Sequence, residues 1–253
     1  MGWVLSQIAA ISEIVDSQAQ ISNSLKKINF WGHELETQIS ASSNSHERLQ
    51  ILSSFFFMKL GFKVSPEGTS QTALFHHVIQ SRSGMALTIS IFYSELAERA
   101  RLKVKLLNIP GHTILKCVGE DQSYFVDISR NGMIMKGNEL LQSLQEKYSM
   151  TLKNQKDFLE LLKEEDLVDL YLKKISSYFH NQKVDQALKL IEFWIHIRPK
   201  DVSLLGKRAY CHFTTGDYGL ALKDLKRYFS FLQDKDRPKD LVEIFDKIES
   251  SHI

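Results

Sequence analysis

The chain contains only two cysteines among its 253 residues, Cys117 and Cys211, and they lie far apart in the sequence. No Cys-x-x-Cys pair is present, so the sequence predicts neither a disulfide-stapled scaffold nor a zinc ribbon. Unpaired cysteines are among the most frequently buried residues. We therefore expect both side chains to be reduced thiols in the core of a cytoplasmic protein.

An excess of one charge and long hydrophobic runs are also missing. The net charge is +2, with 32 basic and 30 acidic side chains, which gives no support for nucleic acid as a partner. No run of 18 apolar residues occurs, so we expect no membrane span. The first residues, MGWVLSQIAAISEIVD, lack the basic start of a signal peptide, and none is expected.

Neither a cofactor nor a metal ion is predicted. No glycine-rich phosphate loop follows a predicted strand, which argues against a nucleotide cofactor. His76 and His77 are adjacent on a predicted helix, where neighbouring side chains point about 100° apart. We therefore do not expect both imidazoles to bind one ion.

Two kinds of hydrophobic periodicity are present. Apolar residues recur at helical spacing through most of the first 60 residues. They recur in residues 83–100, where Ser83 is a candidate N-cap and the first half is apolar all round, so we expect a central, buried helix. The alternation that follows predicts three strands, at residues 103–107, 113–118 and 123–128.

The last two predicted strands bring a histidine and an aspartate together. Pairing them across a hairpin loop at residues 119–122 places Ile114 opposite Asp127. Side chains alternate along a strand, so His112 and Asp127 project from the same side as diagonal neighbours, with Cα atoms about 7–8 Å apart. A histidine held by a carboxylate is two-thirds of a nucleophilic triad, provided that the register does not slip by one residue.

The order of these elements resembles the transglutaminase-like fold of papain-type cysteine enzymes. Active members open the helix with Gly-x-Cys and carry the histidine and the aspartate on the following strands. The resemblance places Gly84-Met-Ala86 on Gly-x-Cys, His112 on the family histidine and Asp127 on the family aspartate. It thus implies a vestigial triad in which alanine occupies the position of the nucleophile.

A narrower resemblance is to bacterial transglutaminase-like/tetratricopeptide-repeat proteins named after an invasion-gene regulator. The matching segments are Arg82-Ser-Gly-Met-Ala-Leu-Thr-Ile-Ser90, Asn108-Ile-Pro-Gly-His112 and Val126-Asp127. That family commonly lacks the catalytic cysteine. The resemblance therefore implies a pseudoenzyme.

The C-terminal part contains an internal repeat of 34 residues, the period of the tetratricopeptide repeat. Sliding the sequence by this period aligns Phe179, Ala187, Leu188, Ile191 and Trp194 with Phe213, Ala221, Leu222, Leu225 and Tyr228. We predict two repeats, at about residues 166–199 and 200–233, followed by a capping helix from about Lys239. The alternative is an unrelated pair of helical hairpins.

The repeat phase predicts a second candidate surface. Phe179, His180, Tyr210 and Phe213 should lie on its concave side, where the aromatic rings could grip an apolar side chain of a peptide. The alternative is that they pack against the first domain. Arg208 occupies a position where a leucine is usual, and we expect an acidic partner for it at the domain interface.

Together these patterns predict an α+β protein. A transglutaminase-like domain with a central helix, an antiparallel sheet and a helical N-terminal part is expected in residues 1–150, followed by an all-α two-repeat domain in residues 151–253. The predicted function is that of a non-catalytic adaptor or regulatory module in the bacterial cytoplasm that binds a protein or peptide. Within it, His112 either staples the strands or lines a ligand groove.

The alternative function is a hydrolase or acyl-transferase with a non-standard nucleophile. The candidates are Cys117, Ser83, Thr88 and Ser90. Cys117 lies five residues after His112, so strand alternation turns it to the opposite face.

Overall fold

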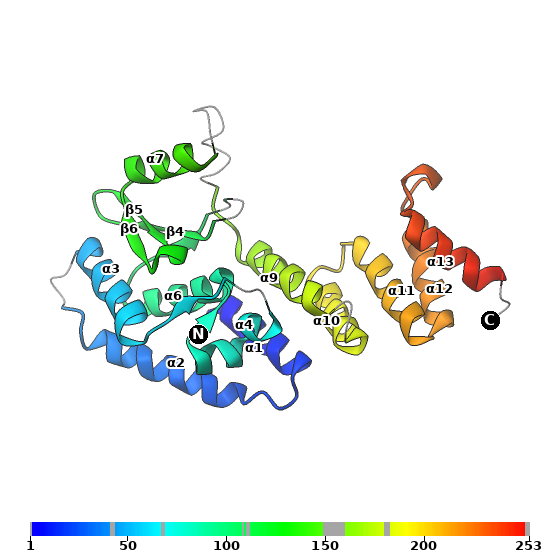
Figure 1. Ribbon diagram of the computed structural model, residues 1–253, viewed down its shortest axis with the longest axis horizontal. Helices are drawn as coiled ribbons and strands as arrows, with labels where there is room; N and C mark the ends of the chain where they lie inside the picture. The colour runs from blue at the N-terminus through cyan, green and yellow to red at the C-terminus, as the bar shows by residue number, and fades with distance from the viewer. Residues whose placement is uncertain are drawn as a thin grey trace. The chain divides into compact units, whose positions relative to one another are not determined.

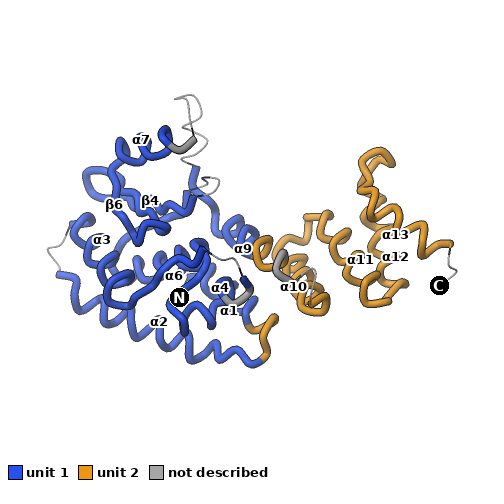
Figure 2. The backbone as a smooth tube through the Cα atoms, in the orientation of Figure 1, with its two compact units in different colours: residues 1–12, 18–171 blue, residues 13–17, 172–253 orange. Residues whose placement is uncertain are grey.

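The structure is a computed structural model that describes residues 2–40, 44–66, 69–107, 109, 112–148, 160–179 and 183–250. The chain divides into two units (Figure 2): unit 1 contains residues 1–12 and 18–171, and unit 2 contains residues 13–17 and 172–253. The predicted boundary between residues 150 and 151 lies outside the described residues. Within the described part, no helix combines the length and the apolar character that crossing a membrane requires.

Unit 1 combines helices with two small sheets (Figure 1). Gly61, with a φ of 73°, lies just after the π-helix at Ser54–Lys59, where the left-handed conformation that glycine tolerates ends the helix. The helices are α1 (Trp3–Val15, in unit 1 as far as Ser12), α2 (Ile21–Glu36), α3 (Ser45–Ser53), η1 (Ser54–Lys59), α4 (Ser70–Ala73), α5 (Phe75–Ser81), α6 (Ala86–Arg99), the 3-10 helix η2 (Ile128–Arg130) and α7 (Gly137–Tyr148).

Helix α6 is the central element of unit 1, as its apolar sequence predicts. It contacts α2, α3 and α5 as well as strand β3 and helix η2. Every residue from Leu87 to Tyr93 is buried. The predicted N-cap is wrong, because Met85 occupies that position and Ser83 belongs to a short strand, β2 (Ser83–Gly84), that pairs in parallel with β1 (Lys63–Val64).

The main sheet is antiparallel, with its strands in sequence order. They are β3 (Val104–Leu106), β4 (Ile114–Val118), β5 (Ser123–Asp127) and β6 (Met133–Met135). The predicted register between β4 and β5 is confirmed, since Ile114 pairs with Asp127 and Val118 with Ser123. Strand β6 was not predicted. It follows a turn at Asn131-Gly132, where both residues have positive φ, and pairs with β5.

The two faces of this sheet meet different helices. Ile114, Phe125 and Met135 share one face and form a buried cluster with Leu140 and Leu144 of α7. The opposite face carries Leu115, which lines a pocket together with residues of α6. In Figure 1 the strands accordingly lie between α6 and α7. This arrangement decides which side chains can approach the start of α6.

The described part of unit 2 is built from helices alone. They are the end of α9 (Glu164–Phe179), α10 (Val184–Ile197), α11 (Ser203–Thr215), α12 (Tyr218–Phe229), the 3-10 helix η4 (Asp234–Asp236) and α13 (Lys239–Ser250). The predicted final helix from Lys239 is present, and α11 and α12 pack against each other as a hairpin. The 34-residue offset carries the start of α10 onto the start of α12. Ala209, Leu225 and Ile244 belong to the core of α11, α12 and α13.

The partner of Arg208 differs from the prediction. Its Nε and Nη2 donate to Oδ2 and Oδ1 of Asp224 at 2.6 and 2.7 Å. Asp224 lies on α12, so this bidentate pair joins the two helices of one hairpin rather than a domain interface. The Asp224 side chain is only 7% exposed, which makes the pair a buried connection between α11 and α12.

Candidate functional site

The start of α6 is built around a glycine. A Cβ on Gly84 would lie 2.6 Å from a methyl carbon of Val78 and 3.1 Å from the carbonyl oxygen of Thr72, so no larger residue fits without a shift. The next amide, that of Met85, donates to the same Thr72 oxygen at 2.7 Å. This packing makes Ala86, which is half-buried, the first residue of the helix. A side chain at this position experiences the positive end of the helix dipole.

Arg82 anchors the segment that leads into α6. It has a φ of 58°, and its guanidinium lies 3.9 Å from the ring centroid of Trp31 and 5.2 Å from that of Phe62. Partial burial lowers the pKa of Arg82. Beyond its place in the family pattern, Arg82 makes cation–π contacts with the two neighbouring aromatic rings.

Asp127 is almost fully buried, and its carboxylate has local partners. Oδ1 accepts from the amides of Ser129 and Arg130 at 2.9 and 3.2 Å, and Oδ2 accepts from Arg130 Nε at 2.9 Å. Arg130 also donates to Ser143 Oγ of α7 at 2.7 Å. Asp127 therefore caps η2 and, through Arg130, connects the end of β5 to α7. It shares a sheet face with Ile114, the face that packs on α7.

His112 lies two residues before β4 and is half-buried. Its amide donates to the carbonyl oxygen of Ile109 at 3.1 Å. Asn108, Pro110 and Gly111 of the same motif lie outside the described residues. The confirmed strand register supports the placement of His112 near Asp127, and the contact between the two side chains remains a prediction.

Three of the alternative nucleophiles, Cys117, Thr88 and Ser90, are buried, whereas Ser83 is half-buried in β2. Cys117 and Cys211 are 0% and 1% exposed, and burial raises the pKa of each thiol to about 11. Thr88 Oγ1 donates to the carbonyl oxygen of Ala73 at 3.1 Å, and Ser90 Oγ donates to that of Leu87 at 2.7 Å; both side chains are buried. At neutral pH these thiols are protonated, and the two hydroxyls have backbone partners.

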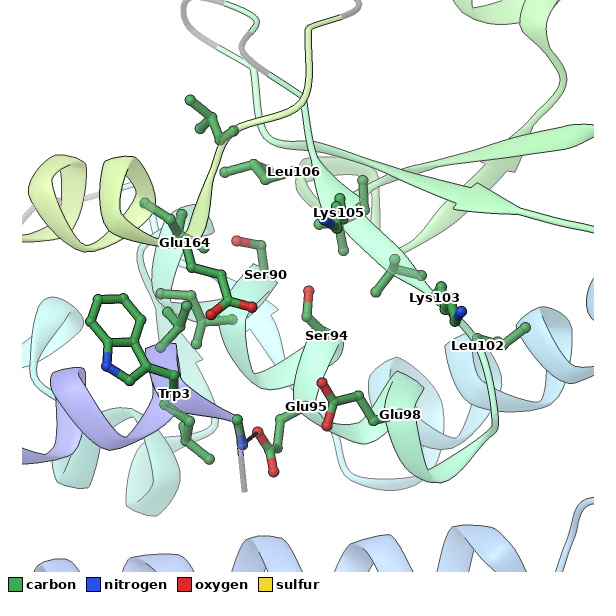
Figure 3. A pocket seen from close by; sticks show the side chains of 18 residues that line it. Trp3, Ser90, Ser94, Glu95, Glu98, Leu102, Lys103, Lys105, Leu106 and Glu164 are labelled. Atoms are coloured by element: carbon green, nitrogen blue, oxygen red, sulfur yellow. Dashed lines mark hydrogen bonds between the residues drawn. The ribbon is translucent and has the colours of Figure 1, made fainter.

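A pocket of about 230 Å³ in unit 1 lies apart from the predicted triad (Figure 3). Ser90 and Ser94 of α6 line it, while Ala86, His112 and Asp127 do not. None of its 18 lining residues is a histidine, so no imidazole in the lining could activate a serine.

One side of this pocket is acidic. Burial, and then the neighbouring charge of Glu95, raise the pKa of Glu98. Glu95 accepts a hydrogen bond from the amide of Gly2 at 2.9 Å, drawn as a dashed line in Figure 3. In that view the carboxylate of Glu164 extends into the pocket.

A groove of about 710 Å³ lies among the helices of unit 2. Pairs of its lining residues that are separated by the repeat period of 34 include Lys173 and Lys207, Ser176 and Tyr210, and Trp194 and Tyr228. The repeat thus places equivalent positions on one surface. The two lysines were missed by the sequence analysis, although the same 34-residue offset that aligned Trp194 with Tyr228 also aligns them.

The predicted partner-binding residues do not all line this groove. Tyr210 lines the groove of unit 2. Phe213 packs against the helical core, with its ring centroid 5.7 Å from that of Tyr218. The side chain of Phe179 and the whole of His180 lie outside the described residues.

The two adjacent histidines lie closer together than expected. The ring centroids of His76 and His77 are 4.1 Å apart. The two side chains do not diverge as expected, so their orientation no longer speaks against a shared ion.

Comparisons with known proteins agree with this architecture. A search of curated proteins found no match to the chain. The model of the transglutaminase-like superfamily matches residues 22–172, which include α6, the main sheet and all three predicted triad positions. The match covers more than half of the sequence, and the chain therefore belongs to the transglutaminase-like superfamily.

Proposed function

We propose that this protein is a non-catalytic member of the superfamily that binds a protein or peptide partner. The observation that carries the proposal is Ala86 as the first residue of α6, the position to which the family pattern assigns the nucleophilic cysteine. A methyl group can neither attack a carbonyl nor be activated by His112.

The contacts of Asp127 support the same proposal. A triad aspartate orients the histidine, which in turn activates the nucleophile beside it. Here the carboxylate accepts hydrogen bonds from Ser129 and Arg130, on the sheet face that packs on α7. An aspartate with this structural role organises the chain around it whether or not a thiol is present.

We include in the proposal that unit 2 is a tetratricopeptide-type pair of repeats and that the protein works in the bacterial cytoplasm. The 34-residue offset between α10 and α12 supports the first part. Cys117 and Cys211 are free thiols, as expected in a reducing compartment, which supports the second.

The test is chemical labelling of the native protein. Wild-type protein is treated at neutral pH with a fluorophosphonate and with iodoacetamide and analysed by intact mass spectrometry. We expect no adduct, because Cys117 and Cys211 are buried and protonated. Both thiols should react after denaturation in urea, which serves as the positive control.

Ala86→Cys provides the complementary test. A thiol at the start of α6 should have a pKa below the ordinary value of about 8.5, measured from the alkylation rate against pH. Lys223→Cys, at an exposed position of α12, is the matched control and should titrate normally. Adding His112→Ala to Ala86→Cys should raise the thiol pKa if His112 lies beside it.

The labelling outcomes separate the two functions. A stoichiometric serine or cysteine adduct on native wild-type protein would contradict the non-catalytic assignment and favour a hydrolase or acyl-transferase. An ordinary pKa for Ala86→Cys would instead show that the alignment of this position is mistaken.

A further inference from the structure

The groove of unit 2 combines two cations with aromatic walls. Lys173 comes from α9, Lys207 from α11, and both side chains are solvent-exposed. The Lys207 ammonium lies 4.6 Å from the ring centroid of Trp194, a cation–π contact that places its charge over the groove wall. The groove thus offers positive charge beside aromatic surface.

Neither Lys173 nor Lys207 forms an ion pair with a carboxylate within the part of the chain that the structure describes. Partial burial lowers the pKa of Lys207, Asp201 raises it, and the like charge of Lys173 lowers it again. The Asp201 carboxylate accepts hydrogen bonds from the amide and the hydroxyl of Ser203, at 3.0 and 2.6 Å. An anion between the two lysines would relieve their mutual repulsion.

The rest of the groove is suited to apolar side chains. Tyr210 and Tyr228 line it, and Gly206 lies at its floor, where a Cβ would be 2.8 Å from Leu241 and 3.0 Å from Tyr228. The absence of a side chain at Gly206 lets Leu241 and Tyr228 pack closely against α11. The volume of about 710 Å³ is within the range of pockets that bind ligands.

We propose that this groove binds an acidic segment of a partner protein, with a Glu or Asp side chain between Lys173 and Lys207 and apolar neighbours against Trp194, Tyr210 and Tyr228. Asp240 also lines the groove, so the segment carries its acid at the lysine end rather than being acidic throughout. The inference rests on the proposed binding function and specifies the chemistry of the partner.

The test uses the full-length chain and three pools of fluorescein-labelled nonapeptides. The pools have Leu or Phe on both sides of a central residue, which is Glu, Gln or Lys, and are otherwise identical. Fluorescence polarisation should show binding of the Glu pool. The isosteric Gln pool should bind roughly tenfold more weakly or worse, because it lacks the charge.

Variants that remove or reverse the two charges show whether these lysines are responsible for binding the Glu pool. Lys173→Gln combined with Lys207→Gln should weaken binding of the Glu pool by about tenfold or more, while Lys223→Gln should leave it unchanged. Lys173→Glu combined with Lys207→Glu should prefer the Lys pool, a switch that misfolding would not produce.

The results that would overturn the inference are equally specific. They are equal binding of the Glu and Gln pools, no binding of any pool, or unchanged Glu-pool binding in the double Lys→Gln variant. None of these concerns the labelling of native protein, so the non-catalytic proposal would stand or fall separately.

Discussion

Each unit contains a buried aspartate paired with an arginine, and the two pairs differ in how far apart their residues lie in the sequence. In unit 1, Asp127 accepts from Arg130 only three residues away and from two backbone amides beside it. In unit 2, Asp224 accepts both hydrogen bonds from Arg208, sixteen residues away on another helix. The first carboxylate organises a chain turn, and the second connects two helices.

This difference bears on how a vestigial site should be recognised. We propose Asp127 as the counterpart of the family aspartate, and its contacts are those of a helix cap and a link to α7. Such an aspartate is needed whether or not a thiol lies nearby. The residue at the start of α6 has no comparable structural requirement for a thiol, so Ala86 is the more informative position about catalysis.

The largest effect should come from breaking the long-range pair. Asp224→Ala leaves the Arg208 guanidinium without its partner between α11 and α12, and we expect the free energy of unfolding of unit 2 to fall by about 2–3 kcal/mol. Urea unfolding followed by the fluorescence of Trp194, in a Trp3→Phe/Trp31→Phe background, reports on this unit.

A double variant distinguishes loss of the pair from loss of packing. Arg208→Leu combined with Asp224→Leu removes both charges and should recover much of the stability, because replacing a buried ion pair with apolar residues is often neutral. If the double variant is less stable than Asp224→Ala, the pair is not the reason for the loss.

A smaller effect is expected at the local pair of unit 1. Asp127→Ala removes the acceptor for two amides and for Arg130, which should lower the free energy of unfolding by about 1–2 kcal/mol. Asp127→Asn keeps the oxygen that accepts from the amides and should lose less. Fluorescence of Trp3 and Trp31 in a Trp194→Phe background provides the measurement, and equal losses for Ala and Asn would argue against the capping role.

The fold was predictable where local chemistry and tertiary structure agree. The β4–β5 register follows from the hairpin loop and from alternation, and the burial of α6 follows from its apolar sequence. Strand β6 was missed because its three residues, Met133–Met135, are all apolar and show no alternation of polar and apolar side chains. The Ser83 cap was wrong because pairing with β1, a tertiary contact, placed that serine in a strand instead.

The same distinction between local sequence and tertiary contacts applies to the candidate sites. The position of Ala86 at a helix start could be inferred from the sequence, because Gly84 and the apolar run that follows mark it. The partners of Asp127 and Arg208 could not, since several acids and bases lie within reach in sequence and only the folded helices select among them. The groove lysines were predictable in principle from the 34-residue offset.

The smallest effect should appear at Glu98. This residue extends the comparison to a carboxyl group that has a raised pKa, in contrast to the two aspartates that are paired with arginines. Burial and the charge of Glu95 raise its pKa, so folding favours the protonated form. The contribution of this group to stability is therefore greatest below the ordinary glutamate pKa of about 4.3 and falls as the pH rises through the folded-state value.

Glu98→Gln resembles the protonated form, and it should stabilise unit 1 at neutral pH by less than about 1 kcal/mol, since the side chain is largely exposed. Urea unfolding of wild-type and variant protein at neutral pH and near pH 4 measures the difference, with Glu243→Gln as an exposed control. The gain should shrink as the pH is lowered. A gain of the same size at both pH values would mean that the charge of Glu98 is not its source.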